Sequence, residues 1–241
     1  MTTTTAPAAI AERVAALPWR ELHESLDAHG YVQTPAVLTP AECRDLSALY
    51  ENGSFRSTIA MARHRFGEGE YRYFDAPLPE TVATLREAFY APLAEAANRW
   101  AGWLDEHDSF PDELADFLTR CHAAGQKRPT PLLLRYGAGD WNALHQDIYG
   151  EVAFPFQMVT VLDRPGEDFD GGEFVLMEQR PRAQSRAHVV GLRRGAFLIF
   201  ATRRRPARGS RGYYRASLRH GVSTVTRGRR TTLGVIFHDA A

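Results

Sequence analysis

The sequence predicts a mainly β fold with a helical N-terminal half, in which a two-sheet jelly roll is braced by α-helices. Three observations support this fold class. Residues 131–238 contain eight short runs of β-forming residues separated by Gly, Pro and Asp. No helical pattern interrupts those runs, whereas several earlier segments carry apolar side chains at helical spacing. The 241 residues are enough for one sizeable core, and no long linker divides them.

We therefore expect a single domain over residues 9–241. Within it, residues 9–130 are expected to provide helical and strand support, and residues 131–238 to form the jelly-roll core. The Thr- and Ala-rich residues 1–8 are expected to form a disordered tail.

In the first half, helix boundaries are marked by caps and stops. Thr39, with Pro40 in the first turn and Glu42 three residues after the cap, has the pattern of a capping box that starts a helix. Gly30 and Gly125 follow helical segments and are expected to end them. We expect helices at 18–28, 40–50, 79–104 and 111–124, short strands at 31–33, 55–61 and 71–74, and a glycine-punctuated loop at 63–69.

The second half is expected to consist of strands. They are predicted at 132–136, 142–148, 156–162, 172–177, 187–190, 196–201, 218–226 and 231–238. Before the seventh of these, residues 203–215 form a glycine-rich segment of arginines and tyrosines, which we expect to be a long loop. Loops at the mouth of a rigid sandwich commonly carry specificity.

The composition is that of an ordinary globular protein, with 44% hydrophobic and 24% charged residues. No apolar run approaches the length needed to cross a bilayer, and the N-terminus has no secretory pattern. The only cysteines, Cys43 and Cys121, indicate neither a disulfide framework nor a zinc site. We expect a cytoplasmic location and no membrane partner.

The formal net charge of zero hides a strong charge asymmetry. From Gln179 to His238 there is no Asp or Glu, yet this stretch carries 15 of the 29 basic residues, all of them Arg. A basic half indicates either an anionic partner such as nucleic acid or packing of acidic helices against basic strands. Phosphate contacts and tyrosine stacking by residues 203–215 would suit a single-stranded or flipped base, whereas a solvated loop or a lid paired with the acidic half is the alternative.

Three side chains form a candidate metal site. His145 and Asp147 stand at alternate positions of a predicted strand and should therefore face the same side. His220 begins a later predicted strand, 73 residues after Asp147. Two imidazoles and one carboxylate form the facial triad that leaves open positions on Fe(II) for a bidentate co-substrate and dioxygen.

Ten residues after His220, Arg230 opens the last predicted strand. Its same-face successors are Thr232, Gly234 and Ile236, and the alternate residues Leu233, Val235 and Phe237 should face apolar packing. An arginine inside a sandwich needs an anion to pair with it. A dicarboxylate meets that need, because a guanidinium can bind its far carboxylate in bidentate fashion.

This pattern resembles the 2-oxoglutarate/iron(II) oxygenases, in their prolyl-hydroxylase-like subgroup. The shared elements are His-x-Asp, a distant His, then Gly at +8 and Arg at +10 from that His. Further parts of the subgroup's pattern over residues 131–238 are matched by Tyr136 with Gly137 and Gly139, by Gly171-Gly172-Glu173 and by Val190–Phe200.

The chain as a whole, including residues 61–67 and 219–223, also resembles a bacterial group of such dioxygenases labelled as acting on damaged nucleic acid. The AlkB-type DNA dealkylases place their co-substrate arginine further beyond the distal His, and this chain departs from that spacing. Nucleic acid, a protein side chain and a small molecule therefore stay open as substrates. The basic segment favours an anionic substrate, and the prolyl-hydroxylase-like spacing favours an amino-acid side chain. A metal-binding module without turnover is the alternative from another class.

The resemblance implies Fe(II) on His145, Asp147 and His220, and 2-oxoglutarate bound through its 5-carboxylate by Arg230 with a hydrogen bond from Tyr136. It implies a dioxygenase that couples oxidative decarboxylation of 2-oxoglutarate to C–H hydroxylation, with ascorbate as reductant in vitro. Attack on a carbon attached to nitrogen would lead to demethylation. The candidates for substrate contact are Arg63, His64, Arg211 and Tyr213.

Overall fold

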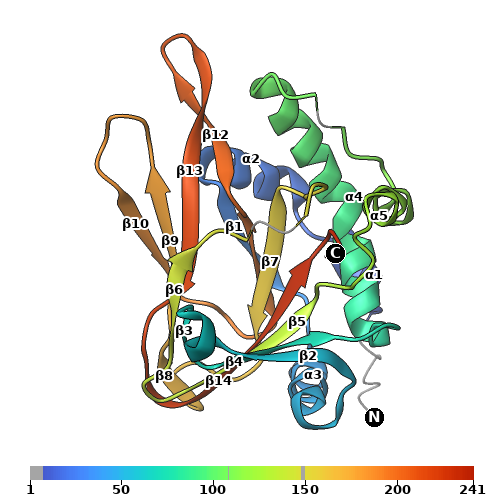
Figure 1. The fold of residues 1–241 in the computed structure, drawn as a ribbon, viewed down its shortest axis with the longest axis vertical. Coiled ribbons are helices and arrows are strands. Elements are labelled where there is room, and N and C mark those ends of the chain that lie inside the picture. The colour runs from blue at the N-terminus through green and yellow to red at the C-terminus, as the bar shows by residue number, and fades with distance from the viewer. Residues whose placement is uncertain (1–7, 108, 148–149) are drawn as a thin grey trace, which may run out of the picture.

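The computed structural model describes residues 8–107, 109–147 and 150–241. Within these residues two antiparallel sheets face each other, and helices cover the outer face of the larger one (Figure 1). The larger sheet has the order β1 (Tyr31–Ala36), β11 (Ala196–Ala201), β7 (Phe156–Val161), β14 (Val225–Ile236), β5 (Leu132–Gly137), β4 (Glu70–Phe74), β2 (Phe55–Ala60), with β8 (Phe169–Gly171) beside β14. The predicted jelly roll is confirmed.

The smaller sheet forms the other layer of the sandwich. Its order is β10 (Arg186–Val190), β9 (Phe174–Gln179), β13 (Gly212–Val222), β6 (Trp141–His145), β3 (Gly67–Glu68), with β12 (Arg204–Gly209) paired to β13. Strands from before residue 131 therefore join both sheets, so the N-terminal half helps to build the sandwich as well as bracing it.

The helices follow the predicted pattern closely. They are α1 (Ile10–Ala15), α2 (Trp19–His29), α3 (Pro40–Asn52), α4 (Glu80–Trp103) and α5 (Leu114–Ala123), with a 3-10 helix η1 (Met61–His64). The capping box of α3 is present, because the Thr39 hydroxyl accepts from the Glu42 N–H at 3.2 Å and the Glu42 carboxylate accepts from the Thr39 N–H at 2.7 Å. Helix α2 ends at Gly30 in the left-handed region, with φ 78°. No helix of the described ranges is long and apolar enough to cross a membrane.

The core lies between the larger sheet and α4. Phe89 of α4 packs on Phe197 of β11, with ring centroids 5.2 Å apart, and Tyr90 packs on Phe154 at the same distance. The odd-numbered residues Leu233, Val235 and Phe237 are fully buried in this core, as the alternation predicted. This layer leaves the opposite face of the sheet free to line a cavity.

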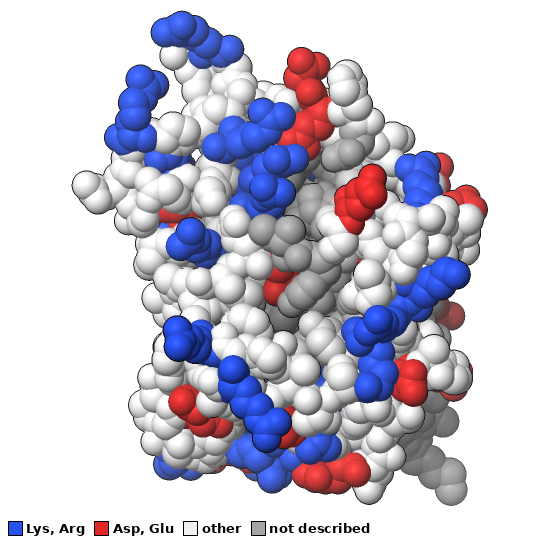
Figure 2. All heavy atoms as spheres, in the orientation of Figure 1, with Lys and Arg blue, Asp and Glu red and all other residues white. Residues whose placement is uncertain are grey.

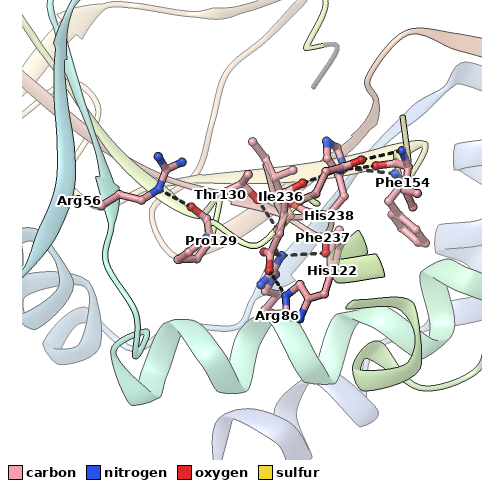
Figure 3. A network of polar contacts seen from close by, with 12 residues as sticks. Arg56, Arg86, His122, Pro129, Thr130, Phe154, Ile236, Phe237 and His238 are labelled. Atoms are coloured by element: carbon pink, nitrogen blue, oxygen red, sulfur yellow. Dashed lines mark hydrogen bonds and ion pairs between the residues drawn. The ribbon is translucent and has the colours of Figure 1, made fainter. Parts of the chain in front are cut away.

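A buried polar network ties the end of β14 to the helices (Figure 3). Arg86 of α4 donates to the carbonyl oxygens of Ile236 at 3.0 Å and Phe237 at 2.8 Å, and to the Asp239 carboxylate at 2.8 Å. The other oxygen of Asp239 lies 3.0 Å from His122 of α5. Because Arg86 and Asp239 are both buried, each compensates the charge of the other.

The segment predicted as a loop at 203–215 is a hairpin, so that expectation was wrong. Strands β12 and β13 pair from Arg204 opposite Ser217 to Gly209 opposite Gly212. The reason is tertiary: Arg205 is buried and donates to Glu178 of β9 at 2.7 Å, which compensates its charge. The local arginine and glycine content could not reveal that partner.

Other boundaries also differ from the prediction. Strand β13 starts at Gly212 and β14 at Val225, so His220 and Arg230 lie inside their strands and do not open them. The strand predicted at 172–177 is β9, which begins later, at Phe174, and is separated from the short β8 by Gly172, which has a φ of 65°. The predicted loop at 63–69 contains part of η1 and the short strand β3. The predicted tail and the end of the 142–148 strand fall on residues 1–7 and 148, outside the described residues.

Candidate metal centre and co-substrate pocket

The three candidate ligands converge at one place. His145 ends β6 and pairs directly with His220 of β13, and Asp147 follows two residues later. One ligand atom from each of the three lies within 4.8 Å of the others. The Nε2 atoms of His145 and His220 stand 3.4 Å and 3.3 Å from the two oxygens of Asp147. Two imidazoles and one carboxylate at this spacing fit the facial coordination of a ferrous ion.

The surroundings of His145 decide which ring nitrogen is free to bind a metal. Its Nδ1 lies 2.7 Å from the Ala143 carbonyl oxygen, which can only accept, so Nδ1 carries the proton. The Nε2 lone pair then faces Asp147. A backbone acceptor behind a ligand histidine is the usual arrangement that orients the ring toward a metal.

The pKa shifts of Asp147 and His220 favour the ionisation states of a divalent-metal site. Burial alone would raise the pKa of Asp147, but the adjacent His220 and His145 rings outweigh it and hold the pKa well below the usual range. Burial lowers the pKa of His220 and keeps its ring neutral near pH 7. Burial alone would lower the pKa of His145, but the Asp147 carboxylate and the Ala143 carbonyl oxygen both stabilise the protonated ring and together raise the pKa. An ionised carboxylate beside a neutral imidazole is a good donor set.

The structure adds Gln157 to the residues around the triad. It lies on β7 of the opposite sheet and donates from Nε2 to Asp147 Oδ2 at 2.7 Å. The same Nε2 lies 3.3 Å from His220 Nε2. Period-two alternation allows either face for residue 157, and only the stacking of the two sheets places its amide over the triad.

A cavity of about 240 Å³ between the sheets connects the triad to Arg230. Arg230 of β14 pairs directly with Tyr136 of β5, and the guanidinium carbon lies 5.4 Å from the Tyr136 ring centroid. Thr232, Gly234 and Ile236 line the cavity together with Arg230, as predicted. Burial raises the pKa of Tyr136 to about 12, so its hydroxyl stays protonated and can donate a hydrogen bond.

The residues at this end of the cavity fit a carboxylate. Arg230 is 2% exposed and donates to the Thr232 hydroxyl at 2.7 Å. No carboxylate in the described part of the chain forms an ion pair with it. A Cβ at Gly172 would lie 2.8 Å from Arg230 Cδ, so glycine there makes room for the arginine stem. A buried guanidinium without a carboxylate partner is a ready anchor for an anionic co-substrate.

The substrate candidates separate into two groups. Arg63 and His64 belong to η1, next to Phe66, which lines the cavity. Arg211 lies in the turn of the β12–β13 hairpin, and Tyr213 lies on β13 just beyond it. Neither of these two lines the cavity that contains the triad. Arg63 and His64 do not line it either, but they adjoin Phe66, which does.

The fold and site define an oxygenase of the kind that binds a metal with two histidines and one aspartate, and comparison with known proteins identifies the family. Residues 69–240 match the model of a family described as "Oxygenase, catalysing oxidative methylation of damaged DNA". An uncharacterised protein of Mycobacterium tuberculosis is 50% identical over 168 residues, which is 70% of this chain and 72% of the relative. The chain belongs to this oxygenase family, and with it to the 2-oxoglutarate/iron(II) oxygenase superfamily.

Solved structures show the same fold at low sequence identity. A prolyl-4-hydroxylase of Pseudomonas putida is 17% identical, with a TM-score of 0.55 over 92% of this chain and 99% of that chain. A prolyl hydroxylase of Trichoplax adhaerens in complex with a hypoxia-inducible-factor peptide fragment is 14% identical, with a TM-score of 0.60 over 95% and 91%. A 2OG-Fe(II) oxygenase family oxidoreductase of Burkholderia pseudomallei is 18% identical, with a TM-score of 0.52 over 98% and 95%. These likenesses support the jelly-roll fold.

Proposed function

We propose that this dioxygenase uses Fe(II) and 2-oxoglutarate to hydroxylate a C–H bond of a nucleic-acid substrate, and that the attacked carbon is a methyl group on a base nitrogen. The observation that carries the reaction class is the placement of three ligand atoms within 4.8 Å of one another, with a buried arginine in the same cavity. The family description supports nucleic acid as the substrate.

Each residue of the pocket has a distinct role in this proposal. His145, Asp147 and His220 would hold Fe(II), and Arg230 with Tyr136 would hold the 5-carboxylate end of 2-oxoglutarate. When bound, the iron and the co-substrate supply the two-electron oxidation of the substrate by dioxygen. The protein orients the ligands and keeps water away, since much of the cavity wall is apolar.

The choice of an N-methyl carbon follows from the chemistry of the product. Hydroxylation of such a carbon gives an N-hydroxymethyl group, whose C–N bond breaks as the hydroxyl proton leaves. The base nitrogen recovers a proton and formaldehyde is released. Oxidation therefore removes the methyl group without a separate hydrolytic site.

The charge distribution is compatible with an anionic substrate. Figure 2 shows that basic side chains, all of them arginines in this part of the sequence, gather over the region of the β9–β10 and β12–β13 hairpins, with acidic groups beside them at the end of α4. Part of this charge is compensated internally, because Arg204 and Arg215 both lie 2.9 Å from Glu106. Salt dependence of binding measures how many of the remaining arginines contact phosphates.

The decisive experiment measures co-substrate turnover first and substrate second. Purified protein with Fe(II), ascorbate and labelled 2-oxoglutarate is expected to release CO₂, and His145→Ala is expected to abolish the release. Methylated single-stranded oligonucleotides should then increase the release and yield formaldehyde, whereas methylated or proline-containing peptides should not. No CO₂ under any mixture would refute the dioxygenase, and stimulation by peptides alone would refute the nucleic-acid substrate.

A further inference from the structure

We propose that Arg63, His64, Arg65 and Phe66 form a rim that holds an unpaired base of single-stranded or locally opened nucleic acid at the mouth of the site. The rim combines an exposed ring stack with two arginines, and it lies directly beside the cavity. This inference rests on the proposed function, because it identifies the surface that presents the substrate to the triad.

Several exposed apolar side chains of the described chain lie along the β3–β6 edge, and one of them, Phe66, reaches the cavity. Five large hydrophobic residues of the described chain are well exposed, and three of them lie on the β3–β6 edge: Phe66 (46%), Trp141 (42%) and Leu144 (41%). Phe66 also lines the cavity, together with His145 at the end of the same edge. An exposed aromatic side chain at a cavity, with further exposed apolar side chains along the same edge, indicates a contact surface for a ligand.

The chemistry of the rim fits nucleic acid. The rings of His64 and Phe66 are stacked, with centroids 5.4 Å apart and planes inclined by 22°. Arg63 and Arg65 flank them, both are exposed, and no acidic residue of the described chain forms an ion pair with either. Aromatic faces that stack on bases, with adjacent cations for the phosphates, are the usual means of binding a single strand.

The β12–β13 hairpin over residues 204–217, also rich in arginine and tyrosine, lies outside the cavity that contains the triad. The Tyr213 ring already stacks on Trp103, with centroids 4.7 Å apart and planes inclined by 7°. Arg204 and Arg215 share Glu106 as a partner. None of these hairpin residues lines the cavity, whereas Phe66 does, so the rim is the better candidate for base stacking beside the triad.

The backbone attaches the rim firmly to the strand that carries His145. The Ala143 N–H donates to the Phe66 carbonyl oxygen at 2.7 Å, and the Phe66 N–H donates to the carbonyl oxygen of the buried Met61 at 3.2 Å. Gly67 has a φ of 125°, and a Cβ there would lie 2.2 Å from the Trp141 carbonyl oxygen. Glycine thus permits close docking of the rim on β6. A base stacked on Phe66 would be held beside the candidate metal ligands.

The path from the rim to the triad is also aromatic. Tyr71 and Tyr73 of β4 line the cavity, and their rings are in edge contact, with centroids 5.4 Å apart. A flat ring that leaves the stack at Phe66 therefore meets further aromatic walls before it reaches the ligands. Such walls favour a planar base over an aliphatic side chain.

The test compares aromatic substitutions at Phe66. Binding of a labelled single strand of about twelve nucleotides is measured by fluorescence anisotropy. We expect Phe66→Ala to weaken binding about 5- to 150-fold, the equivalent of one stacked base. Phe66→Trp should retain affinity, and Phe66→Leu should lose it as Ala does. Tyr213→Ala is the matched control, because Tyr213 is 40% exposed and lies outside the cavity. Arg63→Gln with Arg65→Gln should reduce the salt slope by about two.

The outcomes separate this proposal from the proposed function. Equal binding by wild type and Phe66→Ala, full affinity in Phe66→Leu, or an equal loss in Tyr213→Ala would each overturn the rim. A wild type that binds peptides and no single strand would also overturn it. Release of CO₂ from 2-oxoglutarate by wild type is scored separately, so the dioxygenase can stand while the rim fails. Thermal melting and circular dichroism confirm that each variant is folded.

Discussion

Replacing Arg230 by methionine should separate the stability of the protein from its affinity for the co-substrate. The guanidinium is 2% exposed, and no carboxylate of the described residues forms an ion pair with it. Burial lowers its pKa, although Tyr136, Asp163 and Glu173 oppose that effect. Its charge is therefore destabilising until an anion arrives, and a methionine of similar length removes that cost.

The expected changes in stability and in melting temperature follow from the burial of Arg230 and from the length of the chain. Removing a buried charge without a carboxylate partner should stabilise the ligand-free protein by about 1–3 kcal/mol. A change of 1 kcal/mol shifts the melting temperature by about 2–4 °C in a domain of this size. In wild type, metal with 2-oxoglutarate at a hundred times its Kd should add about 2.7 kcal/mol. The melting temperature should then rise by about 5–11 °C. The variant should lose this rise, because each charge-assisted hydrogen bond is worth about 1.5–3 kcal/mol.

Thermal melting with and without 2-oxoglutarate, at constant metal, measures both effects. Arg229→Met is the matched control, because Arg229 is the exposed neighbour on the same strand and should leave the ligand-induced rise intact. The reasoning is refuted if Arg230→Met melts below wild type without ligand, or if it keeps the full rise with 2-oxoglutarate.

Three further predictions concern the surrounding framework. Gln157→Leu should weaken Co(II) or Mn(II) binding about 10- to 100-fold, because Asp147 loses its hydrogen-bond donor; unchanged calorimetric Kd would contradict this. Asp239→Ala should lower the free energy of unfolding in urea by about 3–5 kcal/mol, since Arg86 stays buried without its carboxylate; a loss below about 1 kcal/mol would count against it. For Glu178, burial alone raises the pKa, but hydrogen bonds from two arginines outweigh it and lower the pKa below 4.5. The ionised Glu178 therefore stabilises the folded protein at pH values above 4.5. This contribution is lost as the pH falls through the pKa that Glu178 has in the folded protein, so Glu178→Gln should flatten the acid limb of a pH–stability curve.

Local signals in the sequence were sufficient for most elements. Three such signals each depend on neighbours within a few residues: the capping box at Thr39, the end of helix α2 at Gly30, and the period-two pattern of β14. For the same reason the His145/Asp147 pair is evident from the spacing of its residues along one strand, and its partner His220 followed from donor chemistry. The structure brings these three together, and it brings Arg230 to the far end of the same cavity.

Elements that depend on distant partners could not be predicted in this way. The hairpin of β12 and β13 resembles a loop in composition, and its buried Arg205 is compatible with a strand only because Glu178 lies on the neighbouring β9. The rim at Phe66 is positioned by hydrogen bonds to β6, 77 residues later at Ala143. Neither contact has a local sequence signal.

The sequence by itself determined the types of donor, their order along the chain and the face of each strand on which they lie. Only the tertiary structure decided that the two histidines pair across adjacent strands, that Gln157 reaches over from the opposite sheet, and that Phe66 lines the cavity while Arg211 and Tyr213 do not. The physical reason is that alternation along a strand is a local property of the backbone. Which residues of one sheet lie opposite which residues of the other, by contrast, is set by packing between residues far apart in the chain.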